Sequence, residues 1–118
     1  MDVSLKPLRP SHLSLGVSDL HVSERFYRDV LGLSARRHDG ELFIEFADFL
    51  IVLTESPPAG RHKFHFGFRV GTDGEVDAWA KRAIDHGVYG VRPHDRDDGR
   101  VVYINDPDEY VIEIYSER

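Results

Sequence analysis

Hydrophobic and polar residues alternate with a period of two in several short segments of the chain, which is the pattern of a strand with one buried face. The first such segment, residues 11–17, reads SHLSLGV, and a later one, residues 63–70, contains HFGFRV. The same alternation predicts four further strands, at residues 41–46, 49–55, 100–105 and 110–116. A tight turn at Ala47-Asp48 would join the first two of these four into a hairpin.

Two segments place apolar residues at helical spacing, and each lies between predicted strands. The first is SDLHVSERFYRDVLGL, in which Ser18 or Asp19 can cap the N-terminus of the helix and Gly32 can end it. The second begins with the capping box TDGE at residues 72–75 and ends at Gly87. The chain is therefore predicted to contain two helices that pack on the apolar sides of the strands.

The two halves of the chain repeat one order of elements. His12 falls on His65 when the halves are aligned at their first strands, and Ile51 falls on Ile112 when they are aligned at their last strands. A longer loop, RPHDRDDG, accounts for the larger offset at the end of the second half. Repetition of this kind indicates two copies of one structural unit.

Each unit has a β-α-β-β-β outline provided that one more short strand forms in it. The candidates for that strand are residues 36–38 in the first half and residues 88–91 in the second. The length of the chain suits one compact domain. We therefore predict an α+β fold in a single domain, residues 1–118, with module 1 at about 11–56 and module 2 at about 63–116.

The alternation sorts the strand side chains onto two faces. One face is apolar and is predicted to form the core under the helices; its members are Leu13, Leu15, Val17, Phe64, Phe66, Phe68, Val70, Val102, Ile104, Ile112 and Ile114. The other face is polar; its members are His12, Ser14, Gly16, His65, Gly67, Arg69, Tyr103, Asn105, Glu113 and Tyr115. In a small domain, such a polar face is either plain solvent-exposed surface or the wall of a binding cavity.

Two histidines and a glutamate on the polar face, His12, His65 and Glu113, have the composition of a 2-His-1-carboxylate metal site. Neutral imidazole nitrogens suit divalent metals, and three protein ligands leave coordination positions open for a substrate. A single histidine in a strand is more often a surface or packed residue. Two histidines at equivalent positions of a repeat, with a carboxylate on the same face by the alternation, favour a metal site instead. The donor types leave Mn, Fe, Zn, Ni and Co open.

Composition and charge narrow the function classes. Hydrophobic residues make up 41% and charged residues 31% of the chain, as in ordinary globular proteins. The formal net charge of −6 argues against a general phosphate-binding surface, so no nucleic-acid partner is expected. The absence of cysteine excludes disulfides and thiol chemistry. Neither a signal-peptide pattern nor a membrane span is visible, so we expect a cytoplasmic protein with no membrane partner.

Three segments together carry a family resemblance: HLSLGVSDLHVSERFYRDVLGL near the start, HFGFRV in the middle and YINDPDEYVIEIY at the end. With them the chain resembles the vicinal oxygen chelate superfamily of glyoxalases, fosfomycin-modifying enzymes, extradiol dioxygenases and bleomycin-resistance proteins. The resemblance implies a curved, cup-like mixed sheet, with helices on its outer face, around a divalent metal held by His12, His65 and Glu113. It also implies a homodimer in which each cup is completed by the second chain.

Departures from the patterns of the superfamily distinguish among its activities. Val52 stands where glyoxalase I would have a fourth ligand, and Pro93 stands near the place of a lysine of fosfomycin-thiol transferases. His94 and Tyr103 precede Glu113 at spacings similar to those of a histidine and a tyrosine of extradiol dioxygenases, which would supply an acid or base and a hydroxyl group. Since loops run over the surface, a solvent-exposed His94 is the competing interpretation.

Two further residues of the polar face, Ser14 and Arg69, are candidates for substrate binding through a hydrogen bond and a positive charge. The predicted function is that of a divalent-metal-dependent enzyme that chelates a small-molecule substrate through vicinal oxygens, with dioxygenase-like or glyoxalase/lyase-like chemistry. One alternative is a metal-free, ligand-sequestering protein of the bleomycin-resistance type. The other is a fosfomycin-thiol-transferase-like enzyme.

Overall fold

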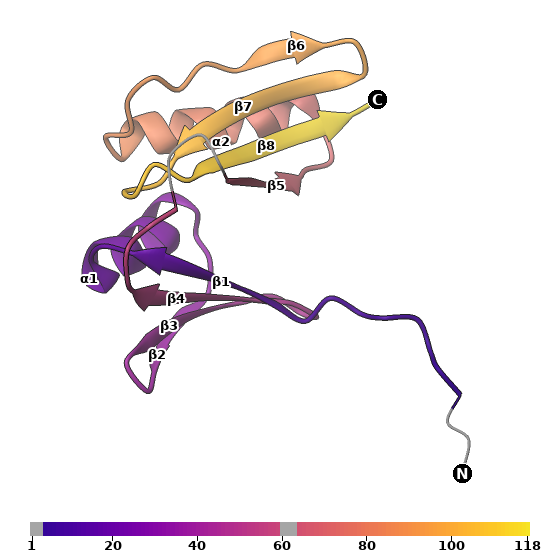
Figure 1. The fold of residues 1–118 in the computed structure, drawn as a ribbon. Helices are drawn as coiled ribbons and strands as arrows, with labels where there is room; N and C mark the ends of the chain where they lie inside the picture. Colours follow the sequence, from indigo (N-terminus) through magenta and orange to yellow (C-terminus); the bar gives the residue numbers. More distant parts are fainter. Residues whose placement is uncertain (1–3, 60–63) are drawn as a thin grey trace.

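The computed structural model describes residues 4–59 and 64–118, which fold into two four-stranded sheets, one from each half of the chain (Figure 1). The first sheet has the strand order β1-β4-β3-β2 and the second has the order β5-β8-β7-β6. Helix α1 (Leu20–Arg25) continues into a wider π-helical segment, η1 (Phe26–Val30), and helix α2 covers Asp73–Asp85. The strands are β1 (His12–Val17), β2 (Ala35–His38), β3 (Glu41–Glu45), β4 (Leu50–Glu55), β5 (His65–Arg69), β6 (His94–Arg96), β7 (Gly99–Asn105) and β8 (Val111–Glu117).

This architecture confirms the predicted α+β fold of two βαβββ modules. In each module the first strand pairs in parallel with the last, and the three later strands pair antiparallel with one another. Among the described residues, no strand of one sheet pairs with a strand of the other, so the two sheets do not close into the predicted cup. Lys63, the first residue of the strand predicted at residues 63–70, lies outside the described residues.

The strand register confirms the alignment of the two halves. Ser14 on β1 pairs with Val52 on β4, and Gly67 on β5 pairs with Glu113 on β8, so the two pairs occupy equivalent positions. Because paired residues of neighbouring strands lie on the same side of a sheet, each sheet has one polar and one apolar face, as the alternation predicted. Position 52 is therefore the counterpart of position 113.

Helix ends form where the capping signals predicted them. The Asp19 carboxylate accepts a hydrogen bond from the backbone N–H of Val22 at 3.1 Å, and the Thr72 hydroxyl accepts one from the N–H of Glu75 at 3.1 Å. Gly32, with φ of 64°, takes the left-handed conformation that reverses the chain after η1. In the described part of the chain, no helix is long and apolar enough to span a membrane.

The apolar faces of both sheets and the inner sides of the helices share one hydrophobic core. Its fully buried side chains include Tyr27, Leu42, Ile44 and Ile104. The predicted core members are buried or packed against this cluster. Ile84, near the end of α2, is 53% exposed, although the residue at the equivalent position of the repeat, Leu31, is buried.

Buried hydrogen bonds tie the two modules together. The Tyr27 hydroxyl, in module 1, donates to Asp106 Oδ2 in module 2 at 2.7 Å, and both residues are buried. In the opposite direction, the Tyr110 hydroxyl donates to the backbone oxygen of Gly16 at 2.6 Å. The two modules are therefore linked by polar contacts as well as by the shared core.

The additional short strands form in both modules, one as predicted and one elsewhere. Residues 36–38 belong to β2, in agreement with the prediction. In module 2 the strand is β6, and residues 88–91 form no strand. The two-residue Asp97-Asp98 turn closes a hairpin between β6 and β7, so part of the charged segment that was expected to be a loop is an edge strand.

Candidate functional site

The polar face of the second sheet brings together three of the predicted site residues. Glu113 on β8 is paired on one side with Gly67 on β5 and on the other with Tyr103 on β7, so these residues form one row across the sheet. His65 is paired with Val111, two positions before Glu113 on the same face. His65, Tyr103 and Glu113 therefore project from three adjacent strands on one side.

Gly67 leaves room in the centre of this row. A Cβ atom at this position would lie 3.1 Å from the backbone oxygen of Glu113 and 3.3 Å from its Cβ, which is closer than ordinary packing. A larger residue would therefore press on the base of the Glu113 side chain. The glycine separates His65 and Arg69 along β5 and keeps the face open beside the carboxylate.

His94 lies on this face as well, on the edge strand β6. It begins β6 rather than lying in a loop, and its ring centroid is 5.9 Å from that of Tyr103 with a tilt of 34°. The His94 side chain is exposed, and Tyr103 is 41% exposed. Both rings are therefore accessible from the side on which Glu113 projects.

Glu113 has a partner that the sequence did not indicate. Arg96, the last residue of β6, places Nη2 3.3 Å from Glu113 Oε2, and its guanidinium carbon lies 5.3 Å from the centre of the Tyr115 ring. The two side chains are only 34% and 17% exposed. Arg96 belongs to the segment RPHDRDDG, which the sequence predicts to be a loop, and only the β6–β7 pairing places it on the face of Glu113.

The predicted substrate-binding residues lie on different sheets. Arg69 is on the face of Glu113 but forms an exposed ion pair with Glu117, with 3.1 Å between Nη1 and Oε2. Exposed pairs of this kind are weak, so the guanidinium group can change partners. Ser14 is exposed on the polar face of the first sheet, where its neighbour in the register is Val52.

His12 also belongs to the first sheet, on edge strand β1, and its Nδ1 lies 2.8 Å from Ser11 Oγ. Among the residues that the structure describes, no three His, Cys, Asp or Glu side chains are close enough to hold a metal ion together. The donor types of His12, His65 and Glu113 suit a divalent metal, but a site that uses all three is not formed within one chain. Val52 adds no ligand at the position equivalent to Glu113.

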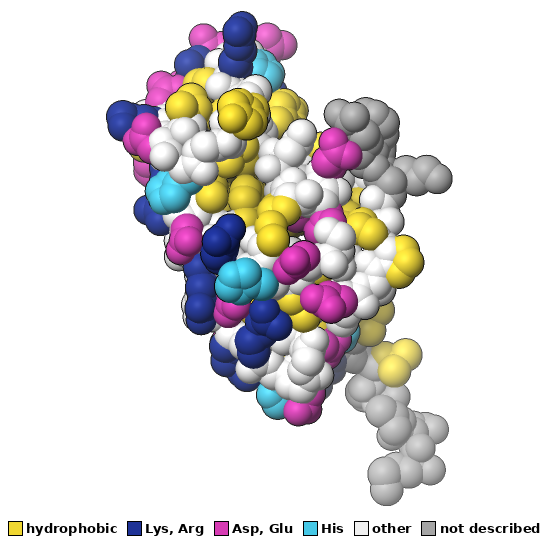
Figure 2. Space-filling model, turned by 90° about the vertical axis from the view of Figure 1, so that its left-hand side faces the viewer, with side chains coloured by type: hydrophobic (Ala, Val, Ile, Leu, Met, Phe, Trp, Pro, Cys, Tyr) yellow, Lys and Arg dark blue, Asp and Glu magenta, His cyan; other side chains and the backbone are white. Residues whose placement is uncertain are grey.

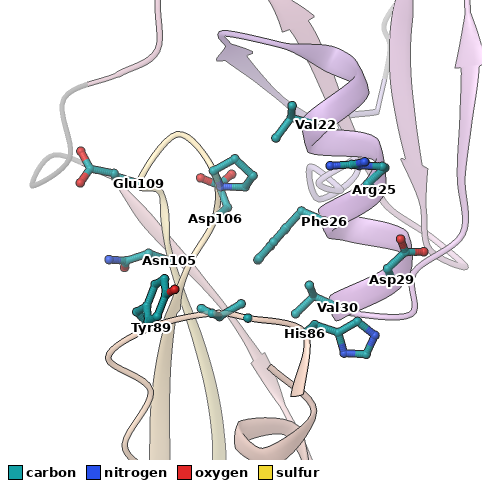
Figure 3. Close-up of a pocket in the computed structure, with 13 residues that line it drawn as sticks. Val22, Arg25, Phe26, Asp29, Val30, His86, Tyr89, Asn105, Asp106 and Glu109 are labelled. Atoms are coloured by element: carbon teal, nitrogen blue, oxygen red, sulfur yellow. The ribbon is translucent and has the colours of Figure 1, made fainter. Parts of the chain in front are cut away.

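A separate pocket of about 600 Å³ lies between α1 and η1 on one side and the β7–β8 turn on the other (Figure 3). Phe26 and Asp106 line opposite walls of it. Burial raises the pKa of Asp106, although hydrogen bonds from Tyr27 and from two backbone N–H groups act in the other direction. The pocket contains none of the predicted site residues, and Asp106 serves there as the contact between the modules.

The surface on this side of the molecule carries both signs of charge. Figure 2 shows basic, acidic and histidine side chains interspersed around hydrophobic ones, over the side that contains α1 and the β7–β8 turn. No single sign of charge dominates the face shown. The chemistry-bearing groups instead concentrate on the polar face of the second sheet, on β5 to β8.

Comparison with known proteins places this chain in a family. The family model described as the Glyoxalase/Bleomycin resistance protein/Dioxygenase superfamily matches residues 9–114, nearly the whole chain. The chain belongs to this superfamily, which is the vicinal oxygen chelate superfamily that the sequence resembled.

Solved structures of the same fold include proteins of different activities. The chain is similar to lactoylglutathione lyase from Agrobacterium tumefaciens, with 25% identity, a TM-score of 0.76, and coverage of 94% of this chain and 95% of that one. It is also similar to a glyoxalase/bleomycin resistance protein/dioxygenase from Nocardioides, with 21% identity, a TM-score of 0.78, and coverage of 98% and 87%. The fosfomycin resistance protein FosX from Mesorhizobium loti shares the fold at 22% identity and a TM-score of 0.72, with coverage of 98% and 95%.

Proposed function

We propose that this chain is a divalent-metal-dependent enzyme acting on a small substrate that bears adjacent oxygens. His65 and Glu113 of one copy and His12 of a second copy would hold the metal. The observation that carries this proposal is the common face of His65, Glu113 and Tyr103, together with the equivalent position of His12 on the other sheet.

The strand order supports a site shared by two copies. β1 and β5 are edge strands, each with a sheet neighbour on one side only, and each begins with one of the two histidines. The Cα radius of gyration is 16.0 Å, against about 13.5 Å for a compact chain of this length. Part of the excess is the extended N-terminal segment, in which Leu5 and Leu8 are almost fully exposed (Figure 1). Association through the free edges would bring the two polar faces together.

The residues around Glu113 have separate tasks in this proposal. A bound divalent metal would act as Lewis acid and template for the substrate oxygens. The Tyr103 hydroxyl, beside Glu113 in the register, would donate a hydrogen bond to a substrate oxygen. His94, with its ring next to that of Tyr103, would accept or return a proton. This arrangement suits lyase-like or dioxygenase-like chemistry.

One observation favours a second candidate function, that of a metal-free ligand-binding protein. The Glu113 carboxylate is already paired with Arg96, so its charge is compensated without a metal. The face that carries Tyr103, Tyr115 and Arg96 could bind a small ligand by stacking and ion pairing alone. Metal content separates the two candidates.

Metal analysis of the purified protein, before and after loading with each of the five candidate metals, is the deciding experiment. We expect about one metal ion per chain, since a two-fold dimer with shared sites has one site per chain. His65→Ala should abolish metal binding. His21→Ala, which changes an exposed histidine of α1, should leave the metal content unchanged. Failure to retain any of these metals would reject the enzyme proposal and favour the metal-free alternative.

A mixing experiment tests whether the site is shared between copies. His12→Ala and His65→Ala should each lose the metal alone. When the two variants are unfolded together and refolded, half of the dimers are mixed, and each mixed dimer regains one of its two sites. The refolded mixture should therefore bind about a quarter of the parent's metal. If the parent binds metal and the mixture binds none, the three ligands do not combine across two chains.

A further inference from the structure

Arg96 crosses the polar face of the second sheet from its edge to its interior. It belongs to β6, and β7 lies between β6 and β8, so its side chain passes over β7 to reach Glu113 on β8. Val101 on β7, which lies on this face, is completely buried although it is not a member of the hydrophobic core. Side chains of the polar face therefore cover it. His94 and Tyr115 flank Val101 in the register, and Arg96 is paired with Gly99, two positions before Val101 on the same face.

The contact between Arg96 and Glu113 leaves both groups with unused bonding capacity. It consists of one nitrogen–oxygen contact of 3.3 Å, whereas a favourable arginine–carboxylate pair has two contacts of about 2.7–2.9 Å. The Nε atom of Arg96 is buried and has no hydrogen-bond partner among the described residues. A buried donor without an acceptor is unfavourable, so an incoming anion that supplies an oxygen would improve the bonding of this guanidinium group.

Metal binding would change the charge balance of this face. Without metal, Arg96 is balanced by Glu113, and Arg69 is balanced by Glu117. A divalent metal held by Glu113 would compete with Arg96 for the carboxylate and repel the guanidinium group. Arg96, which lies over the Tyr115 ring, would then be a cation without its carboxylate partner.

We propose that Arg96 is a specificity-determining residue that selects substrates carrying a carboxylate in addition to the adjacent oxygens. In the metal-free protein it pairs with Glu113, and in the loaded protein it transfers to the carboxylate of the substrate. This inference rests on the proposed metal-dependent function. It adds to that function a substrate class, namely small anionic molecules whose carboxylate lies beside the chelating oxygens.

The first test measures metal affinity alone, by titrating the metal-free protein with Mn²⁺ in a calorimeter. Arg96→Gln should bind Mn²⁺ about three- to tenfold more tightly than the parent, because one competing contact to Glu113 is gone. The matched control is Arg37→Gln. Arg37 also contacts a glutamate, Glu24, at 3.3 Å with similar exposure, but on helix α1 and β2. Arg37→Gln should therefore leave the affinity for Mn²⁺ unchanged.

The second test compares two probes of the Mn²⁺-loaded protein under anaerobic conditions. Catechol and 3,4-dihydroxybenzoate present the same adjacent oxygens, but only the second carries a carboxylate. The parent should bind 3,4-dihydroxybenzoate at least about tenfold more tightly. In Arg96→Gln the ratio should fall to about one, and in Arg96→Lys it should be intermediate, because lysine keeps the charge without the planar fork.

Each outcome of these tests bears on one of the two proposals. If the parent binds no Mn²⁺ or other metal, the proposed function fails, and the role of Arg96 fails with it. If the parent binds metal but Arg96→Gln changes neither the metal affinity nor the probe ratio, or the loaded parent does not prefer 3,4-dihydroxybenzoate, the role of Arg96 alone is refuted. Because Arg96→Lys retains the charge, a folding defect of Arg96→Gln does not prevent a decision.

Discussion

Replacing Tyr27 with phenylalanine would remove one hydroxyl group that connects the two modules and leave the rest of the side chain in place. The hydroxyl donates to Asp106 Oδ2 at 2.7 Å, Tyr27 is fully buried and Asp106 is 4% exposed. The backbone N–H groups of Asp108 and Tyr110 bond the other oxygen, Oδ1, so the substitution leaves Oδ2 without its donor. We expect a loss of about 1.5–3 kcal/mol, the range for a hydrogen bond to a charged group.

Urea denaturation at pH 7 measures this loss. A change of about 2 kcal/mol would move the midpoint by about 1 M urea, given an m-value of about 2 kcal/mol/M for a domain of this size. Tyr103→Phe serves as the control, because it removes a hydroxyl from an exposed ring and should change the stability by less than about 0.5 kcal/mol. If Tyr27→Phe is as mild as this control, the bond does not stabilise the contact between the modules.

The pH dependence gives the same experiment a second readout. Burial raises the pKa of Asp106 above its ordinary value, so its ionised form is disfavoured in the fold and its contribution to stability falls as the pH rises through the folded pKa. The Tyr27 hydrogen bond lowers this pKa, so its removal raises the pKa further. The loss caused by Tyr27→Phe should therefore be largest at neutral pH. It should shrink as the pH falls and the carboxyl group becomes protonated in both proteins; a loss that grows toward acid would contradict this account.

Three further changes have expected outcomes. Hydrogen bonds from Ser116 and Arg118 lower the pKa of Asp73, so an NMR titration should give a pKa below 3.8. This pKa should rise in Ser116→Ala, and an unchanged pKa would show that the Ser116 hydrogen bond does not lower it. This carboxylate favours folding above its ordinary pKa, and that contribution is lost as the pH falls. Gly32→Ala should lower the stability by about 1 kcal/mol in thermal unfolding, because φ is 64° at this position and alanine is strained in that conformation. An unchanged stability would show that the left-handed conformation causes no strain there. Thr72→Ala removes a helix cap and should lower it by about 1 kcal/mol, with Thr72→Ser as the restoring variant.

The fold could be predicted largely because its regularities are local. Alternation with period two assigns each strand residue to a face, and the repeat then matches strands far apart in the chain. The observed pairs Ser14–Val52 and Gly67–Glu113 follow from the same two offsets that align His12 with His65 and Ile51 with Ile112. Since one residue of slippage would put a polar side chain into the core, the hydrophobic pattern determines the register.

The elements that escaped prediction depend on partners distant in sequence or on geometry without a sequence pattern. β6 is three residues long and shows no alternation, and it exists because the Asp97-Asp98 turn lays it against β7. The π-helical segment η1 widens a helix whose apolar spacing resembles that of an ordinary one. Ile84 matches Leu31 in the repeat, but Ile84 is 53% exposed and Leu31 is 4% exposed. At this end of the helices, the match of positions therefore does not extend to burial.

The candidate site shows what the alternation of faces along a strand, or parity, can predict and what it cannot. Parity assigned Glu113, His65 and Tyr103 to one face, and the structure places them on one face. Parity also put His12 on a polar face, but it cannot say whether two polar faces of different sheets meet. Nor can it pair residues across three strands: Arg96 reaches Glu113 only because β6 adds a third strand beside β7 and β8. The groups that complete the environment of Glu113 are therefore set by non-local packing, first by β6 within the chain and then, in our proposal, by the β1 edge of a second copy.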